Sequence, residues 1–112
     1  YEPARRTAAA IMQARRQIAG HLGLDDPKQI LFTSCATESN NTAIFGTAKA
    51  NPHRRHIITT AVEHPAVLEV CKDLQRSGYE VTFLGVDGHG NLELGEFVRL
   101  VGARLRRRKD AG

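Results

Sequence analysis

The chain has 112 residues, 41 % hydrophobic and 25 % charged, with a formal net charge of +4, as expected for one small globular domain rather than a disordered chain. No apolar run approaches the roughly 20 residues of a membrane-spanning helix, so no membrane partner is expected. Cys35 and Cys71 lie far apart and outside any CxxC or Cys/His cluster, which argues against a metal site and a disulfide framework and favours a reducing, cytoplasmic setting. The sequence begins without Met and enters a helical pattern at once, as expected of an internal fragment.

Helical and strand patterns alternate along the chain. Segments with apolar residues at helical spacing predict helices, and short runs rich in β-branched and aromatic residues predict buried strands. Pro65 suits the first position of a helix, where its missing N–H costs nothing, and Gly78 suits the position after that helix ends. The predicted elements are a helix over 4–22, a strand over 29–33, a helix over 38–50, a strand over 56–60, a helix from Pro65 to just before Gly78, a strand over 80–84 and a helix over 94–107.

This α-β-α-β-α-β-α order predicts βαβ units and an α/β fold with a mainly parallel sheet. We expect residues 1–112 to form a single partial domain, with a basic end over 101–112 that diverges or frays. Ligands of such sheets bind at the carboxyl ends of strands. The two loops that lead from a strand directly into a helix, 34–37 and 61–64, are therefore the places where chemistry is expected.

The first loop has the properties of an anion site. Its residues are small, and it leads into a helix whose first N–H groups and positive dipole end attract phosphate. Ala36 and Thr37 would let an anion approach the backbone, and the Thr37 hydroxyl can add a hydrogen bond. An ordinary helix start, with Ser34 or Thr37 as the N-cap and Glu38 in the first turn, is the alternative.

The second loop ends in His64, directly before Pro65. Imidazole is flat, aromatic and titrates near neutral pH, so it suits both ring stacking and general acid–base chemistry. A plain helix cap is the alternative reading of this histidine, and Glu63 is expected to support the loop. Both loops leave neighbouring predicted strands at one edge, so they could flank a single ligand. The other histidines are expected to be structural or solvent-exposed: His21, His53, His56 and His89.

Arginines gather in the first predicted helix and near the C-terminus. Neither cluster is interleaved with aromatic residues, so solvated helix faces are expected and nucleic acid is an unlikely partner. A non-catalytic basic module that uses Arg104–Lys109 to bind an anionic partner stays open as an alternative. The clustered basic residues are Arg5, Arg6, Arg15, Arg16, Arg104, Arg106, Arg107, Arg108 and Lys109.

Two motifs resemble those of a known enzyme family. Residues 32–41 (Phe-Thr-Ser-Cys-Ala-Thr-Glu-Ser-Asn-Asn) are similar to the signature of cysteine desulfurases, which are pyridoxal-phosphate (PLP) enzymes of fold type I in the class V aminotransferase group. Residues 57–68, which contain the Glu-His-Pro sequence, resemble the next conserved strand and loop of that family. Cys35 stands where most members have Gly and resembles the nitrogen-fixation type. The resemblance covers most of the chain and fades after about Leu100.

The resemblance implies a role for each motif. Ala36 and Thr37 would bind the phosphate of PLP, and His64 would stack on its ring and assist proton transfer. The fold would be a segment of the three-layer large domain. The whole enzyme would be a homodimer that converts L-cysteine to L-alanine and an enzyme persulfide, and then passes the sulfur to a scaffold protein for iron–sulfur cluster assembly.

Several parts of the family's active site have no counterpart in these residues. The Schiff-base lysine, the aspartate that contacts the pyridine nitrogen and the nucleophilic cysteine are absent, so this chain alone is expected to be inactive. Other class V chemistry, such as that of a selenocysteine lyase or an aminotransferase, also fits the two motifs and stays open as an alternative. Because an open sheet of three strands has two bare edges, the isolated chain is expected to be marginally stable.

Overall fold

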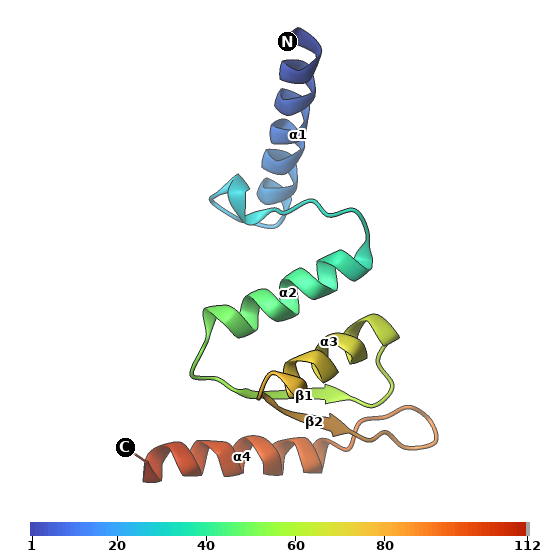
Figure 1. Ribbon diagram of the computed structural model, residues 1–112, viewed down its shortest axis with the longest axis vertical. Coiled ribbons are helices and arrows are strands. Elements are labelled where there is room, and N and C mark those ends of the chain that lie inside the picture. The colour runs from blue at the N-terminus through green and yellow to red at the C-terminus, as the bar shows by residue number, and fades with distance from the viewer. Residues whose placement is uncertain (112) are drawn as a thin grey trace. The chain divides into compact units, whose positions relative to one another are not determined.

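The computed structural model describes residues 1–111 (Figure 1). The described chain forms two compact units, residues 1–34 and the residues from 35 onward, and each is described by itself. That the two units belong to a single domain stays a prediction. The elements are α1 (Glu2–His21), the 3₁₀ turn η1 (Pro27–Gln29), α2 (Ala36–Ala50), β1 (His56–Thr60), α3 (Pro65–Arg76), β2 (Glu80–Leu84) and α4 (Leu94–Asp110).

The first unit consists of α1 and the turn that follows it. α1 ends where Gly23 adopts a φ of 71°, and the Leu24 N–H donates to the Ala19 carbonyl over 2.8 Å. A positive φ favours glycine because it has no Cβ to clash with the backbone. The Arg15 guanidinium lies 5.3 Å from the centre of the Phe32 ring and so ties the end of this unit to its helix.

The strand predicted over residues 29–33 is wrong for this structure. Gln29 ends η1, Ile30 is extended with φ −93° and ψ 119°, and the described residues contain a sheet of only two strands, β1 and β2. The β-branched run does favour an extended backbone, but a strand also needs a hydrogen-bonded partner. Leu31 and Phe32 consequently remain exposed.

The second unit is built on a parallel pair of strands. β1 pairs with β2 in a register that places His56 opposite Glu80 and Thr60 opposite Leu84, with α3 as the crossover helix. The predicted parallel α/β class is therefore confirmed, with two strands in place of three. At the turn into β2, Gly78 adopts a φ of 97°.

The core of the second unit lies between α2, α3 and the sheet. In Figure 1, α3 lies between α2 and the strands, while α4 runs on the other side of β1 and β2. Buried Ala48, Val70 and Leu74 form the centre of this core, and Ile44, Phe45, Ile57 and Tyr79 pack around them. Among residues 1–111, no helix has both the length and the apolar character needed to cross a membrane.

Candidate functional site

The first predicted motif lies at the start of α2. Cys35 is the N-cap residue, with an extended backbone and no capping hydrogen bond from its side chain, and the Ser39 N–H donates to its carbonyl over 3.1 Å. α2 thus begins two residues before the predicted start at Glu38. Ala36 and Thr37 therefore occupy the first helical turn, not the loop. At these positions the backbone N–H groups have no acceptor within the helix, and the positive end of the dipole is closest.

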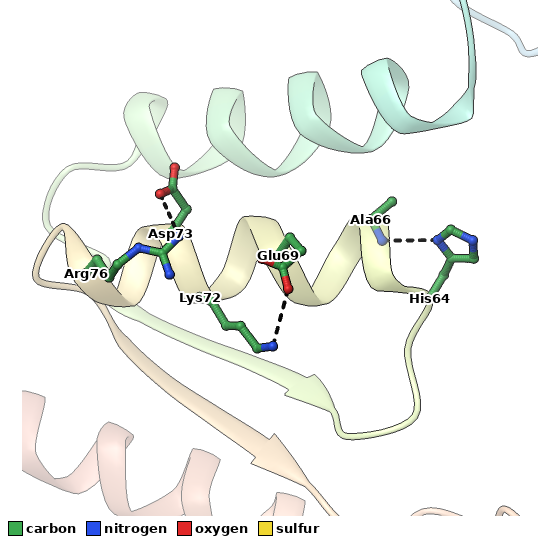
Figure 2. A network of polar contacts seen from close by, with 6 residues as sticks. All are labelled: His64, Ala66, Glu69, Lys72, Asp73 and Arg76. Atoms are coloured by element: carbon green, nitrogen blue, oxygen red, sulfur yellow. Dashed lines mark hydrogen bonds and ion pairs between the residues drawn. The ribbon is translucent and has the colours of Figure 1, made fainter.

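His64 begins α3. Its Nδ1 accepts a hydrogen bond from the Ala66 N–H over 3.1 Å, and its carbonyl accepts from the Val67 N–H over 2.9 Å, as Figure 2 shows for the side-chain contact. The predicted helix-cap reading of His64 is therefore realised through Nδ1. The side chain is exposed, and Nε2 makes no hydrogen bond within residues 1–111. Capping thus leaves Nε2 of this exposed ring available for a ligand.

Glu63 supports this loop, as predicted. Its Oε1 accepts a hydrogen bond from the Thr60 hydroxyl over 3.0 Å, which links the end of β1 to the residue before His64. The Ala61 N–H donates to the Leu84 carbonyl over 2.8 Å and continues the pairing of the strands past the end of β1. His64 is therefore carried by a loop that is fixed at its base.

Thr37 and His64 lie on the same groove, which has a volume of about 500 Å³ and is open to solvent. α2 forms one wall, and the start of α3 with the side of α3 that faces α2 forms the other. The N-termini of both helices lie at the same end of the groove (Figure 2). Ala36 is not among the lining side chains. The groove is lined by Thr37, Asn41, Phe45, His64, Pro65, Ala66, Glu69, Val70, Asp73 and Arg76.

The groove also contains residues that the sequence analysis missed. Asn41 and Phe45 follow Thr37 at intervals of four, so helical periodicity counted from Thr37 places them on one face. That spacing was a usable signal. Asp73 and Arg76, at the other end, form an exposed ion pair of 3.0 Å in which Arg76 Nη2 donates to Asp73 Oδ1. Their contribution could not be foreseen, since it depends on how α3 packs against α2.

These residues fit a phosphorylated aromatic ligand such as PLP. A helix start offers backbone N–H groups to a phosphate, the Thr37 hydroxyl lines the groove beside it, and the exposed His64 ring offers a flat face. No lysine lines the groove, and Lys72 pairs with Glu69 over 3.3 Å. Within residues 1–111, the groove can therefore contact such a ligand but cannot bind it covalently.

Neither cysteine lies in the groove. Cys35 is exposed, whereas Cys71 is 1 % exposed on the inner side of α3. Burial raises the pKa of the Cys71 thiol, an effect partly opposed by a hydrogen bond with the Thr59 side chain. In residues 1–111, no three His, Cys, Asp or Glu side chains are placed to hold a metal ion.

Comparison with known proteins places the chain in a family. Residues 1–106 match the model of the Aminotransferase class-V family, so the chain belongs to that family. A cysteine desulfurase of Trichormus azollae is 56 % identical over 87 residues, which cover 78 % of this chain and 22 % of the relative. The cysteine desulfurase NifS of Azotobacter vinelandii is 47 % identical over 92 residues, covering 82 % and 23 % of the two chains.

A solved structure described as a NifS-like protein gives a TM-score of 0.73 at 39 % identity and covers 87 % of this chain and 27 % of its own. The architecture is therefore a segment of the large domain of PLP fold type I, as the sequence predicted. Class V aminotransferases and cysteine desulfurases are PLP-dependent families. The chain spans about 22 % of the length of the first of these relatives.

Proposed function

We propose that this chain supplies the phosphate-binding and ring-contacting part of the PLP site of a cysteine desulfurase of the nitrogen-fixation, iron–sulfur-cluster type. The observation that carries the proposal is the meeting of Thr37 and His64 on one groove, each at the first turn of a different helix. We propose that these two residues, which are remote in sequence, contact the two ends of one ligand.

The chemistry is divided between the cofactor and the chain. PLP, when bound, supplies an electron sink for the amino-acid substrate. The N–H groups of Ala36 and Thr37 and the Thr37 hydroxyl bind and orient the phosphate. The His64 ring would contact the pyridine ring, and its Nε2 would hold or move a proton. A lysine and a cysteine from elsewhere in the enzyme complete the covalent steps.

The further properties of the whole enzyme belong to the same proposal. The substrate is L-cysteine and the products are L-alanine and an enzyme persulfide. The sulfur then passes to a scaffold protein for iron–sulfur cluster assembly, and the enzyme works as a homodimer in the cytoplasm. The desulfurase activity on L-cysteine is supported by the cysteine desulfurases of Trichormus azollae and Azotobacter vinelandii that the chain resembles. The homodimer, the scaffold protein and the cytoplasmic setting are proposed from the family resemblance alone.

Binding of PLP to the purified chain tests the phosphate role of Thr37. Removal of one hydroxyl hydrogen bond to a charged phosphate should weaken the affinity about tenfold in Thr37→Ala. Thr42→Ala is the matched control, because Thr42 is an exposed threonine of α2 that does not line the groove. Fluorescence titration with PLP, and with pyridoxal lacking the phosphate, measures both affinities.

The two ligands separate phosphate binding from any general effect. Thr37→Ala should leave the weak affinity for pyridoxal unchanged, since that ligand has no phosphate. Equal loss of PLP affinity in Thr37→Ala and Thr42→Ala would contradict the assignment. So would wild-type binding of PLP in Thr37→Ala.

A further inference from the structure

A second groove lies between α4 and the strands β1 and β2, away from the groove that Thr37 and His64 line. Its volume is about 780 Å³, and none of its lining residues belongs to the groove that holds Thr37 and His64. We call it the arginine groove. It is lined by His53, Arg54, Arg55, His56, Ile58, Gly78, Glu80, Val101, Arg104, Leu105, Arg107, Arg108 and Ala111.

Positive charge in the arginine groove exceeds negative charge. Glu80 is the one carboxylate among the lining residues, and it pairs with Arg104. Arg55 is also engaged, because its guanidinium lies 4.1 Å from the centre of the Tyr79 ring and donates to the Ser77 carbonyl over 3.3 Å. Among the arginines that line the groove, Arg54, Arg107 and Arg108 are exposed and make no ion pair or ring contact with another of residues 1–111.

The base of the groove is apolar. Ile58 of β1 and Val101 of α4 are half-buried there, and Leu105 is 57 % exposed beside them. Because this apolar strip lies between cationic side chains, the groove as a whole is amphipathic. It therefore complements a ligand that carries both carboxylates and aliphatic groups. A small inorganic anion would leave this strip exposed.

The pKa of His56 responds to this excess of positive charge. Its Nε2 lies 2.7 Å from the Thr82 hydroxyl oxygen, so the ring is held at the groove wall. Burial lowers the pKa of His56, and the positive charges of Arg104 and Arg107 lower it further. Glu80 and Thr82 on β2 and His53 beside β1 complete the polar surroundings. An anionic ligand in the groove would oppose the effect of the arginines.

We propose that the arginine groove docks an acidic, amphipathic peptide segment of a partner protein. Its carboxylates pair with Arg54, Arg107 and Arg108, whose planar guanidinium groups match carboxylate geometry. Its aliphatic side chains cover the strip of Ile58, Val101 and Leu105. Nucleic acid fits less well, because the lining residues include no Phe, Tyr or Trp for base stacking and a sugar–phosphate backbone would not cover the apolar strip.

Fluorescence anisotropy of a short synthetic peptide with alternating glutamate and leucine tests the proposal on the purified chain. The double variant Arg107→Gln/Arg108→Gln should bind it about tenfold more weakly, as expected for the loss of two exposed charged contacts. Arg5→Gln/Arg16→Gln is the matched control, with the same change in net charge on exposed residues of α1. Circular dichroism confirms that both variants keep their helices.

Two further measurements separate docking from general attraction of charge. An NMR titration of the His56 ring should show its pKa rising when the peptide binds, and not when the glutamine–leucine version is added. Leu105→Ser, at an exposed position, should also weaken binding because it removes part of the apolar strip. Both effects are local to the groove.

The proposal fails if both arginine double variants weaken binding equally, or if the glutamine–leucine peptide binds as tightly as the glutamate one. Wild-type affinity in Leu105→Ser, or an unchanged His56 titration, also overturns it. A duplex DNA oligonucleotide that displaces the peptide at a lower concentration, with the steep salt dependence of phosphate contacts, would assign the groove to nucleic acid instead.

Discussion

His64 carries two separable properties in one side chain. Its Nδ1 caps α3 through the Ala66 N–H, and its ring faces the groove that Thr37 also lines. An asparagine can cap a helix with its side-chain oxygen, but it has no ring to stack on a ligand. Substitution can therefore separate the stabilising contact from the ligand contact.

We expect His64→Ala to lower the free energy of unfolding by about 0.5–2 kcal/mol, the usual cost of a lost N-cap. His64→Asn should keep nearly wild-type stability, because asparagine is a good N-cap residue. Both variants should bind PLP more weakly, since both lack the imidazole. Urea unfolding followed by circular dichroism, together with PLP fluorescence, measures the two effects.

Two results would contradict this division of roles. If His64→Asn were as unstable as His64→Ala, the hydrogen bond to the Ala66 N–H would not be the source of the stability. If His64→Asn bound PLP with wild-type affinity, the ring would not contact the ligand.

At the scale of elements, the sequence predicted β1 and β2 residue for residue, and it placed the helices to within a few residues at each end. Local periodicity is enough for that, because each helix carries an apolar face and each strand a β-branched run. The early start of α2 was missed because Cys35 gives no N-cap signal. The segment 29–33 was misassigned because pairing with another strand is not a local property.

The candidate site divides in the same way. Ala36, Thr37 and His64 stand out because two loops join a strand pattern to a helix pattern, and the family motifs cover both. Arg76 and Asp73 could not be selected from the sequence, because they line the groove only through the packing of α3 against α2. Binding of phosphate and ring by the selected residues stays a prediction until it is measured.

β1, β2 and α4 are coupled through His56, which should make stability depend on pH. The pKa of His56 is lowered in the folded chain by burial and by Arg104 and Arg107, so the unfolded chain binds more protons as the pH falls. This contribution to stability is complete above the ordinary histidine pKa and is lost on acidification. We expect the free energy of unfolding to fall between about pH 7.5 and pH 5.5.

Comparison of two glutamine variants isolates this contribution. Urea titrations of His56→Gln at the two pH values should show a smaller loss of stability than the wild type. His89→Gln, which changes an exposed histidine in the turn before α4, should behave like the wild type. The same pH dependence in His56→Gln and in the wild type would rule out His56 as its source.

At the scale of the whole molecule, the buried apolar set is small. Among residues 1–111, the buried hydrophobic residues are Ala19, Ala48, Val70, Cys71, Leu74 and Leu84. Two of them are alanines, which contribute little apolar area. Large apolar side chains remain exposed in both units, including Ile11, Leu31, Phe32, Val62 and Val98. Exposed apolar surface on this scale favours association.

We therefore expect the purified chain to unfold over a broad temperature range, to bind a hydrophobic dye and to aggregate on heating. The physical reason is that few buried apolar side chains offset the conformational entropy that the backbone loses on folding. Scanning calorimetry and dye fluorescence measure both properties. A sharp, cooperative and reversible transition without dye binding would contradict this expectation.

The hydrogen bond that begins α3 also fixes where the His64 proton can be. Because Nδ1 accepts from the Ala66 N–H, its lone pair is occupied, and the neutral imidazole must carry its hydrogen on Nε2. The backbone amide thereby selects one tautomer and orients the N–H donor outward. A proton can bind to Nδ1 only if the hydrogen bond from the Ala66 N–H breaks. Proton transfer through Nδ1 therefore requires the first turn of α3 to open.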